Sequence, residues 1–325
     1  MTTFGSGASP RRESSAVIGA IEAGGTKFVC GIGTADGELL DRVSFPTGQP
    51  DETLGRAIDY FADKNVAAIG IGSFGPIDLR PGSPTYGFVT TTPKPGWSGC
   101  DFLGALRRRF DVPYGWDTDV NAAAYGEAVW GAAAGLDSCL YYTIGTGVGI
   151  GVYAEGRLLH GLLHPEGGHT LPRRHQGDGF AGVCPYHGDC LEGMASGPAL
   201  QARWGVPGHE LPADHPAWEI EAHYIAQSVS SAILLLSPRK VILGGGVMQQ
   251  EHLLPLVRRD VAKNLNGYVA AEDLAEGAGL DGYITAPGLG TESGLRGALV
   301  LGIRALREAR EPGVPGAVGS GTAQD

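Results

Sequence analysis

The sequence lacks most of the features that mark secreted, membrane-spanning or nucleic-acid-binding proteins. Its five cysteines are odd in number and too few for a disulfide framework, and no run of 18 apolar residues could cross a bilayer. Lysine and arginine form no run longer than three residues, and the net charge of -11 disfavours a nucleic-acid partner. Residues 1–15 have no apolar segment typical of a secretion signal, so we interpret them as a disordered lead-in. We therefore expect a cytoplasmic protein with reduced thiols and neither a membrane nor a nucleic-acid partner.

Glycine, in contrast, is abundant, with 54 residues gathered in short clusters beside apolar runs. This pattern predicts tight loops around phosphate groups. The apolar periodicity predicts strands and helices in alternation, which is typical of an α/β fold, and a chain of 325 residues is long for a single core. The expected strands are 16–25, 26–33, 37–46, 66–72, 112–116, 139–145 and 240–246, and the expected helices are 50–65, 120–134, 216–236 and 291–310.

Two segments of the chain resemble each other. Residues 20–40, "AIEAGGTKFVCGIGTADGELL", and residues 142–159, "YTIGTGVGIGVYAEGRLL", both read as strand, Gly/Thr turn, strand, acidic-Gly turn and Leu-Leu. A duplicated domain would produce this likeness, and so would two ordinary glycine-rich hairpins. The sequence leaves both possibilities open.

Three glycine loops stand at the ends of expected strands. Glu22 to Lys27 and Gly145 to Gly149 offer bare backbone amides, a Thr hydroxyl and, in the first, a Lys ammonium to a polyphosphate. Neither is a Walker loop, and neither leads into a helix as a dinucleotide fingerprint does. Gly244 to Gly246 form a third loop, where a purine or ribose could lie on the backbone. Together they favour a nucleotide cleft over three unrelated turns.

A carboxylate-rich junction, "WDTDVN", lies between an expected strand and an expected helix. Asp117 or Asp119 could simply cap the helix. Alternatively, Asp119 is a general base that takes the proton from a substrate hydroxyl as this hydroxyl attacks a phosphate, a role worth about 10² to 10⁴ in rate.

A candidate metal site follows in residues 164–197. Cys184, His187 and Cys190 are evenly spaced, and His169 can complete a tetrahedral zinc site. With four protein ligands such a zinc would be structural, and it would fix the directions of Glu166 and Glu192 as acceptors for sugar hydroxyls. The alternative is a pair of core cysteines beside surface histidines. The remaining histidines of this region are interpreted as ordinary solvent-facing residues, namely His160, His164 and His175.

Seven motifs in this order make the chain similar to the ROK family of repressors and sugar kinases, and within it to bacterial fructokinases: "IEAGGTK", "GIGSFGPID", "TDVNAAAYGE", "TIGTGVGIG", "HPEGGH", "CPYHGDCLEGMASGPA" and "LGGGVM". The resemblance implies an actin-like, ribonuclease H-like sugar-kinase fold with two α/β domains and a cleft. It also implies a homodimeric enzyme that phosphorylates fructose at its 6-hydroxyl with MgATP. The expected domains are 16–121 with a returning helix 293–310, and 122–292, followed by a flexible tail 311–325.

The resemblance also implies roles for individual residues. Asp119 matches the catalytic base. The sugar would be surrounded by Gly72, Ser73, Asn121, Glu166, His169 and Glu192, and structural zinc would be bound by His169, Cys184, His187 and Cys190. ATP and Mg²⁺ would be held by Glu22, Gly24, Gly25, Thr26, Lys27, Gly145, Thr146 and Gly147, with Gly244, Gly245 and Gly246 at the adenosine.

Three departures from the glucokinase pattern agree with the fructokinase branch. Glu22 replaces an Asp, Thr118 replaces an Asn that could bind sugar hydroxyls, and the zinc spacing is Cys-x-x-His-x-x-Cys. A broader hexose kinase acting on mannose or glucose remains an alternative. A non-catalytic sugar-binding or regulatory protein is another, although a repressor would need a DNA-binding domain ahead of the first strand, where we expect none.

Overall fold

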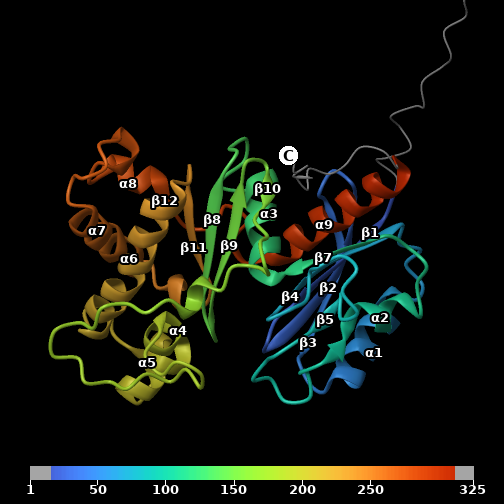
Figure 1. The fold of residues 1–325 in the computed structure, drawn as a ribbon, viewed down its shortest axis with the longest axis horizontal. Coiled ribbons are helices and arrows are strands. Elements are labelled where there is room, and N and C mark those ends of the chain that lie inside the picture. The colour runs from blue at the N-terminus through green and yellow to red at the C-terminus, as the bar shows by residue number, and fades with distance from the viewer. Residues whose placement is uncertain (1–15, 312–325) are drawn as a thin grey trace, which may run out of the picture.

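The computed structural model describes residues 16–311, so the predicted lead-in 1–15 and residues 312–325 of the predicted tail lie outside the described residues. Two α/β halves lie side by side, each built on a five-stranded sheet (Figure 1). Within the described part of the chain, no helix combines the length and apolarity needed to span a membrane.

The first sheet has the strand order β3-β2-β1-β4-β7. Its strands β1 and β2 are antiparallel, as are β2 and β3, whereas β1, β4 and β7 run parallel. Apolar side chains of its helices and strands form one core. The elements are β1 (Ile18–Ala23), β2 (Lys27–Gly33), β3 (Leu39–Pro46), α1 (Pro50–Phe61), β4 (Ala68–Ser73), the short pair β5 (Phe88–Val89) and β6 (Cys100–Asp101), α2 (Phe102–Arg107) and β7 (Tyr114–Thr118).

The second sheet has the order β10-β9-β8-β11-β12. The long helix α6 lies against it and shares a core with strand residues such as Leu140 and Tyr142. The elements are β8 (Cys139–Ile144), β9 (Val148–Ala154), β10 (Arg157–Leu158), α4 (Leu191–Ala195), α5 (Gly197–Trp204), α6 (Ala217–Leu236), β11 (Val241–Gly244), α7 (Leu253–Leu265), α8 (Ala278–Tyr283) and β12 (Ile284–Thr285).

The two sheets repeat one topology. In the second sheet β8 and β9 are antiparallel, as are β9 and β10, while β8, β11 and β12 run parallel, so each strand has a counterpart in the first sheet. The similar segments 20–40 and 142–159 overlap the first three strands of each sheet. Two unrelated hairpins would not also share the placement of the parallel strands, so the structure favours the duplication.

Two helices connect the halves, namely α3 (Asp119–Trp130) and α9 (Ser293–Arg310). The chain's last described helix returns to the first sheet (Figure 1), where Leu295 and Leu299 pack with Ile18. A Cβ on Gly297 would overlap the Ala122 carbonyl, so only glycine allows α3 and α9 to cross this closely. The helix expected from 291 begins at Ser293 after a 3₁₀ turn. The predicted boundary at 121 falls within α3, and the domain division stays a prediction.

Candidate active site and metal centre

The three predicted glycine loops gather between the halves. The hairpin after β1 and the hairpin after β8 meet directly, because the hydroxyl oxygens of Thr26 and Thr146 are 3.2 Å apart. The loop after β11 lies beside the second hairpin, since a Cβ on Gly145 would be 3.5 Å from the amide nitrogen of Gly246. Gly245 has a φ of +93°, which glycine adopts at little cost. The backbone amides that could hold a polyphosphate are therefore concentrated in one place.

The members of the three loops, all at or after strand ends, are Gly24, Gly25, Thr26, Lys27, Gly145, Thr146, Gly147, Gly244, Gly245 and Gly246. Gly24 is held in its turn by a hydrogen bond from its amide to the carbonyl of Lys27, and Lys27 itself is exposed. A second cation reaches this hairpin, because the ammonium of Lys94 donates to the carbonyl of Gly25. No pattern in the sequence indicated Lys94, which lies in a Thr- and Pro-rich loop far along the chain.

Asp119 is the first residue of α3 and directly follows β7. Its Oδ1 accepts a hydrogen bond from the backbone amide of Val120 at 2.9 Å. Burial raises the pKa of Asp119 to about 6, against the smaller opposing effect of backbone hydrogen bonds. A carboxyl with a pKa near neutrality can both accept and release a proton at physiological pH, which suits a general base.

Glu22, in β1, is an acidic neighbour of Asp119. Burial raises the pKa of Glu22 to about 7, and the charge of Asp119 adds to the rise, while Lys27 and the amide of Leu295 oppose it. A divalent cation bound beside these two carboxylates would stabilise their ionised forms.

The helix cap belongs to Thr118, and not to either aspartate. Its Oγ1 accepts from the amide of Asn121 at 3.1 Å, so Thr118 is committed to starting α3, and Asp119 is free of that role. Asp117 is buried and accepts from the amide of Thr118 and from Nδ2 of Asn121, both at 2.8 Å. The Oδ1 of Asn121 in turn accepts from the amide of Val152 at 3.1 Å.

Three residues expected near the sugar thus have structural contacts. Asn121 is buried and both ends of its amide are engaged within the protein. Ser73 is fully buried and donates to the carbonyl of Phe74 at 2.9 Å. Gly72 packs against α3, where an added Cβ would lie 2.6 Å from the Cβ of Ala122. Direct contact of these three residues with a sugar stays a prediction, and this geometry gives it no support.

Glu166 and Glu192 face the same region as Asp119. Partial burial raises the pKa of Glu166 to about 7, and the charges of Asp119 and Glu192 contribute. The side chain of Glu166 is 46 % exposed, so it is accessible to a ligand. Glu192 has an additional contact that the sequence did not indicate, because its Oε2 accepts from the amide of Val148 at 3.0 Å. This bond joins the start of α4 to the phosphate hairpin that precedes β9.

The interpretation of His160, His164 and His175 as ordinary solvent-facing residues is wrong for His164, whereas His160 is exposed as expected and His175 is partly buried. The side chain of His164 is only 2 % exposed, and its Nε2 accepts from the amide of Ile77 at 3.1 Å. His160 lies 2.8 Å from Oδ2 of Asp117, and this carboxylate raises the pKa of His160. His175 is half-buried and its ring contacts that of His223 edge to face.

The predicted metal ligands converge. One ligand atom from each of His169, Cys184, His187 and Cys190 lies within 4.8 Å of the others. The Nδ1 of His169 is 3.5 Å from Cys190 Sγ and 3.8 Å from Cys184 Sγ, and the Nδ1 of His187 is 3.6 Å from Cys184 Sγ. Metal–ligand bonds of about 2.3 Å to sulfur and 2.0–2.1 Å to nitrogen in a tetrahedron place N and S about 3.6 Å apart. The residues therefore fit a tetrahedral ion with two thiolate and two imidazole ligands.

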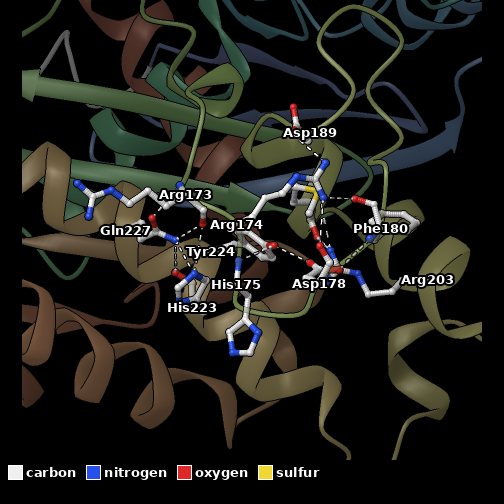
Figure 2. Close-up of polar contacts among 11 residues, drawn as sticks. Arg173, Arg174, His175, Asp178, Phe180, Asp189, Arg203, His223, Tyr224 and Gln227 are labelled. Carbon is white, nitrogen blue, oxygen red and sulfur yellow. Dashed lines mark hydrogen bonds and ion pairs between the residues drawn. The ribbon is translucent and has the colours of Figure 1, made fainter.

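The loop between His169 and Cys184 is fixed by polar contacts (Figure 2). Asp178 is paired with Nη1 of Arg203 at 2.9 Å and accepts from the hydroxyl of Tyr224. Arg174 joins the loop to the turn between the later metal ligands, through Asp189 at 2.9 Å. Residues far apart in the sequence thereby hold the loop in the form that brings the four ligand side chains together.

Comparisons with known proteins agree with this geometry. The family model described as "ROK family" matches residues 18–305. A putative fructokinase of Bacillus subtilis (strain 168) is 53 % identical over 260 residues, which cover 80 % of this chain and 87 % of that protein. A fructokinase of Pediococcus pentosaceus is 50 % identical over 252 residues, covering 78 % of this chain and 88 % of that protein. The ROK hexokinase from Thermus thermophilus has a similar structure, with a TM-score of 0.70 at 26 % identity, covering 90 % of this chain and 99 % of that one. The predicted two-domain, actin-like sugar-kinase fold is confirmed.

Proposed function

Because the chain belongs to the ROK family, we propose that it transfers the γ-phosphoryl group of ATP to the 6-hydroxyl of fructose. The observation that carries this proposal is Asp119, a carboxyl with a pKa of about 6 at the start of α3, together with two glycine hairpins that meet between the halves. The relatives at 50–53 % identity are described as fructokinases, which supports fructose as the acceptor.

Asp119 acts as the general base. The fructose hydroxyl oxygen forms a bond to the γ-phosphorus while the bond to the bridging oxygen of ADP breaks, and Asp119 takes the hydroxyl proton. A pKa of about 6 leaves most Asp119 side chains ionised at neutral pH yet basic enough to accept this proton. The remaining catalysis is positioning of donor and acceptor.

The glycine loops bind the nucleotide. Backbone amides of Gly25 and Thr26 and of Thr146 and Gly147, with the Lys27 ammonium, face the phosphates, and Gly244 to Gly246 adjoin the adenosine. Mg²⁺, when bound, neutralises phosphate charge. Glu22 would hold the ion directly or through water, because burial and the charge of Asp119 both disfavour ionisation of Glu22 unless a cation is present.

The metal centre orders the sugar site. We assign structural Zn²⁺ to His169, Cys184, His187 and Cys190, because two thiolates and two imidazoles in a tetrahedron suit zinc and leave no open position. Glu166 and Glu192 then accept hydrogen bonds from sugar hydroxyls, with His169 beside them. Residues 164–197 also contact the second glycine hairpin, since the amide of Gly197 donates to the carbonyl of Gly145 at 2.7 Å.

The proposal extends to the organisation of the whole protein. The first domain comprises 16–121 with the returning helix, and the second comprises 122–292. The enzyme works as a homodimer in the cytoplasm, where ATP is abundant and a reducing environment keeps thiolate ligands intact.

Initial rates of ADP formation with MgATP and fructose, mannose or glucose test the function. We expect kcat/KM for fructose to exceed that for either aldose by at least about tenfold, a factor that a few hydroxyl contacts can supply. Phosphorus NMR of the product should show a 6-phosphate. Equal or better rates with glucose would show a broader hexose kinase, and no sugar-dependent ADP would point to a non-catalytic sugar-binding protein.

A further inference from the structure

His164 lies between the loop after β4 and the side chain of Glu166. It is not the proposed base, a metal ligand or part of a nucleotide loop. On one side its Nε2 accepts a hydrogen bond of 3.1 Å from the amide of Ile77, four residues after β4. On the other side its Nδ1 is 3.3 Å from Oε1 of Glu166. The ring therefore contacts both the first half of the fold and a carboxylate of the second half.

The Ile77 contact determines which ring nitrogen carries the proton. A backbone amide can only donate, so Nε2 of His164 must be unprotonated, and in a neutral ring the proton then resides on Nδ1. Burial lowers the pKa of His164, which favours this neutral form. The Nδ1–H then has two acceptors beside it, the backbone carbonyl of Pro165 and the carboxylate of Glu166.

The loop after β4 is shaped to receive both side chains. A Cβ on Gly75 would lie 3.4 Å from Cε1 of His164 and 3.6 Å from Oε1 of Glu166. The loop therefore comes within ordinary contact distance of both the ring and the carboxylate. Glu166 is otherwise 46 % exposed and faces the charges of Asp119 and Glu192, so His164 is a neutral donor in an acidic neighbourhood.

A purely structural histidine would account for the burial, the Ile77 bond and the contact to Pro165, but not for the placement of Nδ1 3.3 Å from an accessible carboxylate. We propose that His164 is a positioning residue that accepts from the amide of Ile77 with one nitrogen and orients the Glu166 carboxylate toward the sugar with the other. This inference rests on the proposed function, in which Glu166 accepts a sugar hydroxyl.

Two amide substitutions separate the two contacts. The amide of glutamine reaches the position of Nε2, so His164→Gln can keep the Ile77 bond and loses the donor to Glu166. The shorter asparagine places its amide near Nδ1, so His164→Asn can keep the donor and loses the acceptor for Ile77. His209→Gln is the matched control, because His209 is 74 % exposed and lies outside the site.

We expect His164→Gln to raise the fructose KM, and the fructose Kd measured by calorimetry without nucleotide, by about tenfold, equivalent to about 1.4 kcal/mol. Its kcat, its KM for ATP and its melting temperature should stay close to those of the parent. His164→Asn should keep the fructose KM within about threefold and melt at a lower temperature, because the buried Ile77 amide loses its acceptor.

The inference is overturned if the asparagine variant loses fructose affinity while the glutamine variant retains it, or if both change by the same factor. If both variants bind fructose as the parent does, the inference is equally wrong. Failure of the parent protein to bind or phosphorylate fructose would refute the proposed function instead, so the two failures are distinguishable.

Discussion

Substitution of Glu127 is expected to lower the free energy of unfolding strongly. It is fully buried in α3, and its Oε2 accepts from the amides of Ala132 at 2.7 Å and Gly288 at 2.9 Å. Its Oε1 accepts from the amide of Leu289 at 3.0 Å and the hydroxyl of Ser293 at 2.7 Å. This carboxylate therefore ties α3 to the loop that leads into α9.

The substitution Glu127→Gln keeps the shape and replaces one acceptor oxygen by a donor. In the better of the two amide orientations the hydroxyl of Ser293 can rotate to accept, but the amide of Leu289 is left unpaired. An unpaired buried group costs about 1–3 kcal/mol, and the other bonds lose their charge-assisted strength. We expect a loss of about 2–4 kcal/mol, or roughly 4–16 °C in melting temperature at 2–4 °C per kcal/mol.

Thermal unfolding followed by circular dichroism measures this change. The control is Glu308→Gln, because Glu308 is 47 % exposed and its ion pair with Arg304 lies on the surface of α9. Such a pair contributes little, so the control should melt within about 2 °C of the parent. If Glu127→Gln melted as close to the parent as the control does, the assignment of Glu127 as the junction's buried acceptor would be refuted.

Three further predictions concern pH, metal and packing. Because the base must be ionised, kcat should be constant above about pH 7 and fall as the pH drops through about 6, the pKa of Asp119; a flat profile down to pH 5 would contradict this. Cys184→Ser should lose zinc, as measured by metal analysis, and raise KM for both fructose and ATP, since Glu192 contacts the phosphate hairpin; normal KM values in zinc-free protein would exclude the coupling. Gly297→Ala should destabilise by at least about 1–3 kcal/mol through overpacking of α3 and α9, whereas Gly55→Ala, which meets no atom within 4 Å, should stabilise by about 0.5–1 kcal/mol; denaturant midpoints would reveal a reversed order.

Much of the site could be predicted because it depends on local patterns. Apolar alternation marks the strands, and a Gly/Thr cluster after a strand favours a turn, so the three loops followed from the order of residues. The four metal ligands could also be predicted, because Cys and His at this spacing are typical of a metal site. The four side chains converge into a group that could hold a metal ion, whereas the bound ion and its identity as zinc stay predictions.

The contacts that the sequence could not reveal join residues distant in the chain. Ile77 and His164 are 87 residues apart, and nothing near His164 indicates a buried ring. Thr118 was expected to matter for sugar choice, but its hydroxyl caps α3. Polar residues at a strand–helix junction can face either ligand or protein, and the packing of the second half decides which. Contacts between residues distant in the sequence therefore show that Asn121 serves the protein fold. Composition alone does not distinguish its role from that of Asp119.

The catalytic role of Asp119 is tested most directly by comparing Asp119→Asn with the parent in two measurements on the same preparation, fructose binding by calorimetry and turnover with MgATP. The account predicts that the Kd for fructose stays within about threefold while kcat falls by about 10² to 10⁴, the contribution of a general base. Turnover equal to that of the parent, with fructose still bound, would contradict the assignment of Asp119 as the base.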